Sequence, residues 1–178
     1  MKFTNKNSIF FIISIIIVIT AISITYNNKA APVIDKTGKS APNFTLKDIN
    51  GKTVTLASNK GNVVVLEFFA TWCPPCKDSI PHLNNLNAKY KAKGLIVYGI
   101  NLDGNTDAAT LKKFALENNV QYEILLSDDS TGRLYNINSI PVTYIINKKL
   151  NVVNVYIGFS SNLEDIIDKE VEALLKDV

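Results

Sequence analysis

Two cysteines at the end of an apolar run are the residues of this sequence best suited to do chemistry. Cys73 and Cys76 are separated by two prolines, and no other cysteine occurs among the 178 residues. Proline fits the first turn of a helix, where its missing N–H leaves no hydrogen bond unmade. The pattern therefore places Cys73 at a helix N-terminus, where the dipole lowers the thiol pKa below its usual value of about 8.5. A thiolate there can attack a disulfide, and Cys76 can then resolve the mixed disulfide.

A single acidic residue interrupts the apolar run before the cysteines. Residues 63–69 read Val-Val-Val-Leu-Glu-Phe-Phe, and Glu67 lies six residues before Cys73. Burying a carboxyl group without a partner is costly, so a buried Glu67 calls for a role. With a raised pKa it could accept the proton of Cys76 during resolution. The alternative is a carboxylate on a solvated strand face or at the edge of a sheet.

The same apolar run predicts the strand around which the domain is built. Residues 63–69 suit a strand that is buried on both faces. Strands and helices alternate along the chain, which predicts an α/β fold with a central mixed sheet flanked by helices on both faces. We expect strand 63–69 at the centre of the sheet and the cysteine pair at its carboxyl end. The other expected elements are a hairpin of strands 43–46 and 53–56, strands 95–102, 122–126, 142–146 and 152–157, and helices 75–91, 106–118, 130–135 and 163–175.

The first 40 residues differ in kind from the rest. Residues 8–26 carry no charge and are mostly apolar, close to the roughly 20 residues that cross a bilayer as a helix. We expect an uncleaved transmembrane anchor preceded by a cytoplasmic tail, residues 1–7. A signal peptide is the alternative, although its apolar region would be shorter, about 7–15 residues. Residues 27–40 are small and polar, which predicts a linker to a domain that spans 41–178.

Composition and charge exclude several classes of function. The formal net charge is only +3 and the two signs are interspersed, which argues against a nucleic-acid partner. With one histidine and two cysteines, a four-ligand zinc site would need carboxylates, so we predict no metal and no cofactor. The single histidine, His82, is expected to have a packing or surface role. Lys77 and Asp78 are expected on a solvated face.

The stretch 64–76 resembles the active-site strand and helix of the thioredoxin superfamily. Within that superfamily the chain is similar to the membrane-anchored TlpA/ResA-type thiol–disulfide oxidoreductases. The similarity runs from about residue 40 to the end of the chain, and it implies a thioredoxin-like fold with an N-terminal β-hairpin and a TlpA-type strand–helix insertion. The further matching features are the anchor, Ser40 to Leu46 with Asn50-Gly51-Lys52, the extra strand and helix around 95–119, and Ile140-Pro141-Val142-Thr143.

The resemblance also assigns roles to residues around the cysteines. It implies that Cys73 is the exposed nucleophile and Cys76 the resolving thiol. Pro141 matches a cis-proline that faces the pair and exposes backbone for contact with a substrate, and Gly158 matches a glycine of the same groove. Trp72 offers a flat apolar surface beside the pair. The residues expected to contact a substrate are Trp72, Pro74, Pro75, Ile140, Pro141 and Gly158.

One pair of positions departs from the TlpA/ResA pattern. Glu67 stands at the buried-acid position of ordinary thioredoxins, where TlpA/ResA-type proteins more often carry Asn. Several of those proteins have a Glu three residues after the second cysteine, where this chain has Ser79. We therefore expect the active-site acid to have moved from the helix to the strand, which leaves the redox pKa values and the substrate open.

The leading hypothesis is a single-pass membrane protein whose domain lies outside the cytoplasm and reduces protein disulfides. Disulfides persist there, and the resemblance implies a reductase with substrates such as an apocytochrome c. Its electrons would come from a membrane thiol transporter. A potential near thioredoxin's, about −270 mV, would suit reduction, whereas one near about −120 mV would indicate an oxidising disulfide donor.

Two other classes of function are less well matched. A peroxiredoxin-like thiol peroxidase would need a Thr three residues before its cysteine and an arginine nearby. Ala70 stands at that spacing, and the only arginine, Arg133, is distant in sequence. A binding module with a structural disulfide is the third possibility, but a ring of four residues constrains little.

Overall fold

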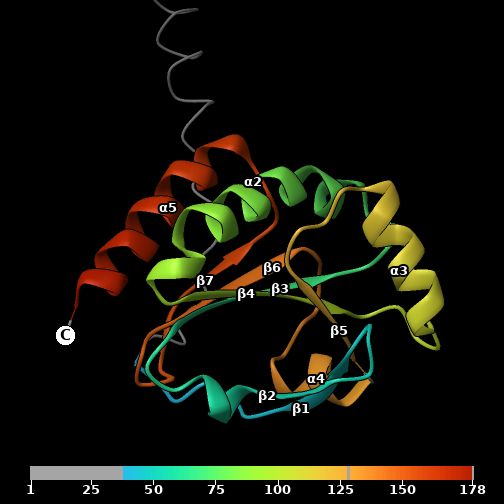
Figure 1. The fold of residues 1–178 in the computed structure, drawn as a ribbon, viewed down its shortest axis with the longest axis horizontal. Coiled ribbons are helices and arrows are strands. Elements are labelled where there is room, and N and C mark those ends of the chain that lie inside the picture. Colours follow the sequence, from blue (N-terminus) through green and yellow to red (C-terminus); the bar gives the residue numbers. More distant parts are fainter. Residues whose placement is uncertain (1–37, 128, 178) are drawn as a thin grey trace, which may run out of the picture. The chain divides into compact units, whose positions relative to one another are not determined.

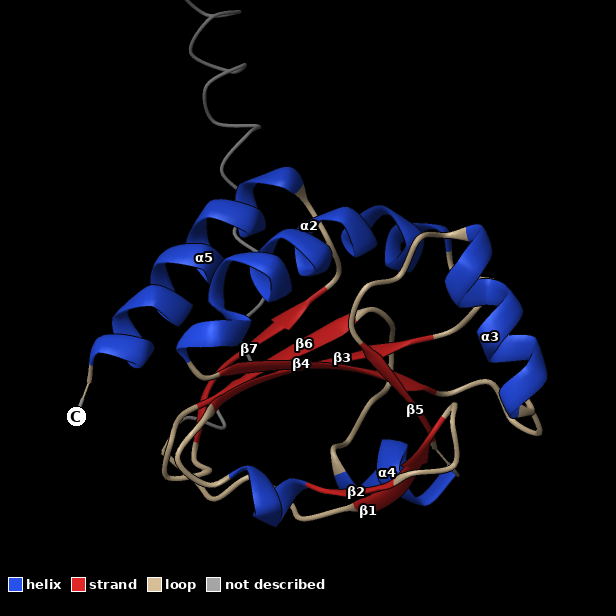
Figure 2. Cartoon of the chain, viewed as in Figure 1, coloured by secondary structure: helices blue, strands red, loops and turns tan. Residues whose placement is uncertain are grey.

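Residues 38–127 and 129–177 are described by a computed structural model, in which a seven-stranded sheet has helices on both faces (Figures 1 and 2). The predicted tail and anchor, residues 1–26, and most of the predicted linker lie outside these residues. Within the described part of the chain, no helix is long and apolar enough to cross a membrane.

Every strand and helix expected of the described domain is present. The bounds lie close to the expected ones, because the alternating and helical patterns were strong and glycines or prolines mark most ends. The strands are β1 (Thr45–Asp48), β2 (Thr53–Thr55), β3 (Val63–Phe69), β4 (Leu95–Asn101), β5 (Glu123–Leu126), β6 (Val142–Ile146) and β7 (Val152–Ile157). The helices are α2 (Pro74–Tyr90), α3 (Ala108–Glu117), α4 (Asp129–Leu134) and α5 (Ser161–Lys176), with 3-10 turns η1 (Leu56–Asn59) and η2 (Lys91–Lys93).

The sheet is mixed, as predicted, and its strand order is β2-β1-β5-β4-β3-β6-β7. β3 pairs in parallel with β4, and β4 with β5, whereas the remaining neighbours are antiparallel. The expectation that strand 63–69 is central was wrong by one position. The N-terminal hairpin extends the sheet beyond β5, so β4 is the middle strand and β3 lies next to it, between β4 and β6.

β3 is buried along its whole length, and its side chains alternate between two layers of the core. Val64 and Leu66 pack in the layer that contains Tyr135, the residue after α4. Val63 and Val65 pack in the layer formed with α2 and α5. Because successive strand residues point to opposite faces, Glu67 shares the α2 face with Val63 and Val65.

The N-terminal end of the described chain is hydrogen-bonded to the edge strand β7. Gly38 N donates to the carbonyl of Val152, and Val152 N donates to the carbonyl of Lys39, each over 2.8 Å. Ser40 also forms a bridge with Asn151. The last three residues of the predicted linker are therefore held against the domain.

Candidate active site

The two cysteines form a disulfide at the start of α2. Their Cα atoms are 5.3 Å apart. Cys73 is the N-cap residue, and its Sγ accepts a hydrogen bond from the Cys76 backbone N–H over 3.3 Å. This is the position where the helix dipole and unpaired N–H groups favour a thiolate, so the predicted placement is confirmed.

The burial of Cys73 differs from what the resemblance implied. Cys73 is 3% exposed and Cys76 is 1% exposed, so in the disulfide state the nucleophile is nearly as covered as the resolving residue. Both cysteines belong to an apolar cluster with Phe69 and Ile80, and Ile140 packs against this cluster. A substrate must therefore reach a sulfur that lies within an apolar surface.

An exposed surface flanks the buried pair. Trp72 is 71% exposed. Among the exposed large apolar side chains of the described residues, only one residue of α3 is more exposed. Pro74 and Pro75 are also exposed, as are Lys77 and Asp78, which were predicted on a solvated face. Trp72 and the two prolines thus form an apolar rim from which a polypeptide substrate can approach the disulfide.

The segment before β6 lies on the same site. The Ile140–Pro141 peptide bond is cis, which confirms that prediction. Ile140 packs against the cluster that contains both cysteines, and Gly158 N donates to the Pro141 carbonyl over 2.8 Å. Gly158 has a φ of +78°, a backbone conformation that glycine adopts readily. Ile140 therefore lies against the cysteine cluster, and Gly158 is hydrogen-bonded to the proline that follows Ile140.

Glu67 is buried beneath α2, where Ser79 contacts it. It is 3% exposed, so the alternative of a solvated carboxylate was wrong. It lies opposite Thr143 on β6 and Gly99 on β4, and Ser79 Oγ is 2.5 Å from its Oε1 atom. Burial raises the pKa of Glu67 from its usual 4.5 to about 8, and hydrogen bonds with Ser79 and Thr143 oppose the rise. The carboxyl group is therefore mostly protonated at neutral pH.

Ser79 connects this carboxyl group to the cysteine pair. Its hydroxyl lies 2.8 Å from the carbonyl oxygen of Cys76 as well as 2.5 Å from Glu67. In the sequence, Ser79 is visible only as the residue that stands where related proteins have an acid. The signal for its role was its position three residues after Cys76, which puts both residues on one face of α2.

A second group that sequence reasoning missed holds the loop before the cysteines. Asp103 Oδ2 accepts hydrogen bonds from the Thr71 backbone N–H over 2.9 Å and from Asn101 Nδ2 over 3.0 Å. Its Oδ1 atom is buried without a hydrogen-bond partner among the described residues. The available signal was an Asn-x-Asp sequence at the carboxyl end of a strand parallel to β3.

Replacing Asp103 with alanine is expected to loosen the active-site loop. The Thr71 N–H would lose a charged acceptor, which costs about 1–3 kcal/mol in unfolding free energy. Urea unfolding of the oxidised protein measures this loss, and insulin-disulfide reduction measures the effect on the loop that carries Trp72. We expect a slower reaction as well as a less stable protein.

Asp107→Ala is the matched control, since Asp107 also accepts a backbone N–H, that of Thr110 at the start of α3. It should cost about 1 kcal/mol in stability and leave the reduction rate unchanged. Equal rates for the Asp103 and Asp107 variants would show that the contact with Thr71 does not position the site.

His82 is buried between α2 and α5, which agrees with the packing role predicted for it. It is 5% exposed. Burial lowers its pKa below the usual value, and the negative charges of Glu164, Asp168 and Asp165 on α5 oppose this shift. Nothing among the described contacts of His82 links it to the cysteine pair.

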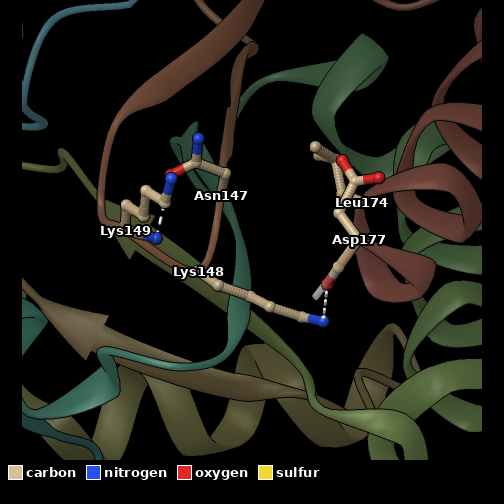
Figure 3. Close-up of a pocket in the computed structure, with 5 residues that line it drawn as sticks. All are labelled: Asn147, Lys148, Lys149, Leu174 and Asp177. Carbon is tan, nitrogen blue, oxygen red and sulfur yellow. Dashed lines mark hydrogen bonds between the residues drawn. The ribbon is translucent and has the colours of Figure 1, made fainter.

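The pocket in Figure 3 lies at the other end of β3 from the cysteines. Lys148 Nζ donates to the carbonyls of Leu175 and Asp177, 2.9 and 2.5 Å away, and thereby caps α5. The Lys148 carbonyl accepts from Gly61 N, just before β3 begins. Lys148, which lines the pocket, therefore has a structural role at the end of α5 and at the start of β3. Its lining residues are Asn147, Lys148, Lys149, Leu174 and Asp177. Within residues 38–127 and 129–177, no three His, Cys, Asp or Glu side chains are grouped to hold a metal ion.

The chain is similar to known thiol–disulfide oxidoreductases. The model of the AhpC/TSA family matches residues 37–155. Thiol-disulfide oxidoreductase ResA of Bacillus cereus is 35% identical over 123 residues, which are 68% of this chain and 69% of that protein. ResA of Bacillus subtilis is 34% identical over 122 residues, 68% and 67% of the two chains. A putative thiol:disulfide interchange protein DsbE from Chlorobium tepidum superposes with a TM-score of 0.72 and 32% identity, covering 78% of this chain and 97% of that one.

The fold and the disulfide at the start of α2 define a thioredoxin-like thiol–disulfide oxidoreductase. The chain belongs to the AhpC/TSA family, and within it to the proteins of ResA/DsbE type. The resemblance inferred from the sequence is thus confirmed, as is the class of enzyme.

The peroxidase alternative has no support in the site. Ala70 is buried and has no hydroxyl to offer at the spacing where a peroxidase needs one. Arg133 is exposed on α4, which covers the face of the sheet opposite α2 (Figure 1). Neither requirement of a peroxidatic cysteine is met beside Cys73.

Proposed function

We propose that this protein reduces protein disulfides outside the cytoplasm while residues 8–26 anchor it in the membrane. The observation that carries the proposal is the buried Glu67 carboxyl group, joined through Ser79 to the Cys76 backbone. A dithiol that gives up two electrons must release the proton of its resolving thiol. The ionised form of Glu67 is the proposed acceptor of that proton.

The proposed reaction has two steps. The Cys73 thiolate attacks one sulfur of the substrate disulfide, a mixed disulfide forms, and the other substrate sulfur leaves as a thiolate. The Cys76 thiol then gives its proton to the Glu67 carboxylate, and the Cys76 thiolate attacks Cys73 Sγ. The second substrate sulfur leaves, so two electrons pass to the substrate and the enzyme becomes the disulfide. A membrane thiol-electron transporter would return the pair to the dithiol.

The surroundings of Cys73 favour the reducing direction. A strongly oxidising pair owes its potential to a highly stabilised reduced form. Among the described residues, Cys73 Sγ accepts a hydrogen bond from the Cys76 N–H, and Cys73 otherwise lies in an apolar cluster. Relatives named ResA and DsbE support a role in thiol–disulfide exchange. Protein disulfides, for example those of an apocytochrome c, are the proposed substrates.

Labelling of cysteines in intact cells tests location and direction together. Cells that produce the full-length chain are treated with a membrane-impermeant maleimide, and the labelled fraction is measured by a gel shift. The chain has only two cysteines, so the label reports the pair alone. We expect labelling without added reductant, because an external reductase is kept as the dithiol by its electron donor.

Two outcomes would contradict the proposal in different ways. Labelling that requires cell lysis would refute the external location. Labelling that requires prior treatment with dithiothreitol would show a pair that rests as the disulfide, as in an oxidising donor. A double variant, Cys73→Ser with Cys76→Ser, is the control for unspecific labelling.

A further inference from the structure

The Ser79 hydroxyl lies between two oxygen atoms, both within hydrogen-bond distance. Glu67 Oε1 is 2.5 Å away and the Cys76 carbonyl oxygen is 2.8 Å away. All three residues are almost fully buried, with Ser79 and Cys76 each 1% exposed and Glu67 3% exposed. A hydroxyl group has one proton to donate, so Ser79 cannot donate to both neighbours at once.

The direction of these two hydrogen bonds follows from counting protons. The Cys76 carbonyl can only accept, and an ionised carboxylate can only accept as well. With Glu67 ionised, one of the two short contacts would join two acceptors. With Glu67 protonated, its O–H donates to Ser79 Oγ and the Ser79 O–H donates to the Cys76 carbonyl. The observed geometry therefore fits a neutral Glu67, in agreement with its raised pKa.

We propose that Ser79 is the positioning residue of the proton-transfer step. Its hydroxyl donates to the Cys76 carbonyl while Glu67 is protonated, and it turns to donate to Glu67 when the carboxyl group ionises. This inference rests on the proposed role of Glu67 as the proton acceptor for Cys76. Ser79 touches neither the substrate nor a reacting sulfur. It acts by setting the fraction of Glu67 that is ionised and can accept a proton.

Residues from outside α2 also face Glu67. From β6 the Thr143 hydroxyl also hydrogen-bonds the carboxyl group, and from β4 the facing residue is Gly99, which has no side chain. Burial raises the pKa of the Tyr122 phenol, before β5, and the charge of Glu67 raises it further. Tyr122 therefore stays neutral where Glu67 titrates.

Removal of the Ser79 hydroxyl should lower the fraction of Glu67 that is ionised and able to act as a base. An ionised carboxylate gains more from a hydrogen-bond donor than a neutral acid does. Ser79→Ala is therefore expected to move the Glu67 midpoint upward by about one pH unit or more. At pH 7 the carboxylate fraction, and with it the rate of the second step, should fall about tenfold.

The reaction of the reduced full-length chain with Ellman's reagent separates the two steps. Attack by Cys73 releases one thionitrobenzoate, and attack by Cys76 on the resulting mixed disulfide releases a second. We expect the first phase of Ser79→Ala to match wild type from pH 5.5 to 9.5. The pH profile of the second-phase rate should keep its shape and move to higher pH. Ser79→Thr, which retains a hydroxyl, should restore the wild-type profile. Cys76→Ala, with no second phase, is the control.

A second measurement does not depend on turnover. In the oxidised protein the cysteines do not titrate, so the infrared band of the protonated Glu67 carboxyl group reports its midpoint directly. Glu67→Gln, which lacks the band, identifies it. An unshifted midpoint in Ser79→Ala would overturn the role of Ser79, as would a shift that Ser79→Thr fails to reverse.

Glu67→Gln in the Ellman assay separates the two proposals. If its second phase matches wild type at every pH, Glu67 is not the proton acceptor and the reaction proposed for the site is wrong. If its second phase is slowed while that of Ser79→Ala is unchanged, Glu67 keeps its role and only the inference about Ser79 fails.

Discussion

Replacing Cys73 with serine is expected to abolish the reduction of insulin disulfides by the full-length chain. A serine hydroxyl is not ionised at neutral pH, so the helix N-terminus that favours a thiolate has no nucleophile to stabilise. Loss of an essential nucleophile lowers turnover by on the order of 10⁴-fold or more. The rate of insulin precipitation with a thiol reductant measures the effect. Unchanged reduction would mean that the Cys73–Cys76 disulfide is structural.

Cys76→Ala should stop the reaction at a later step than Cys73→Ser, which makes it the matched comparison. Cys73 can still attack a substrate, but no second thiol resolves the product, so a mixed disulfide accumulates on Cys73. Non-reducing gels of cells that produce this variant should show adducts that vanish with dithiothreitol. Mass spectrometry of those adducts identifies the substrates. A Cys76→Ala chain that shows no more adducts than the wild-type chain would mean that Cys73 does not trap substrates at this site.

Much of the fold could be predicted because its signals are local. The apolar run 63–69 and the Asn50-Gly51 turn each depend on a few neighbouring residues. The order of strands in the sheet is not local. β1 pairs with β5 through Asp48 and Leu125, far apart in the chain, and this pairing is what moves the centre of the sheet from β3 to β4.

The parts of the site that escaped prediction depend on packing between distant segments. The contact of Asp103 with Thr71 spans 32 positions and exists because β3 and β4 run in parallel and end together. Ser79 was visible in the sequence, but its contact with Glu67 requires α2 to lie across β3. Cys73 was expected to be exposed, and its burial depends on the segment at Ile140 that packs over the pair.

Glu67→Gln is expected to stabilise the protein as pH rises. The carboxyl pKa is about 8 in the fold and about 4.5 when unfolded. Between these values the folded state keeps a proton that the unfolded state has released, so folding stability falls as pH rises from about 4.5 to 8. Glutamine cannot ionise, and its amide can donate to Ser79 as the protonated acid does. The gain over wild type should be near zero at pH 4.5 and reach roughly 3–5 kcal/mol at pH 8.5.

Denaturant unfolding of the oxidised full-length chain in mild detergent, at pH 4.5 and at pH 8.5, measures this difference. Glu117→Gln, at an exposed carboxylate of α3, is the control and should show no comparable dependence on pH. A Glu67→Gln variant that is only as stable as wild type at both pH values would mean that Glu67 is ionised at little cost and accessible to water. The same variant should resolve mixed disulfides slowly. We therefore expect Glu67→Gln to raise stability and to slow the second step. Both effects are expected when a buried carboxyl group is kept for accepting a proton and not for stability.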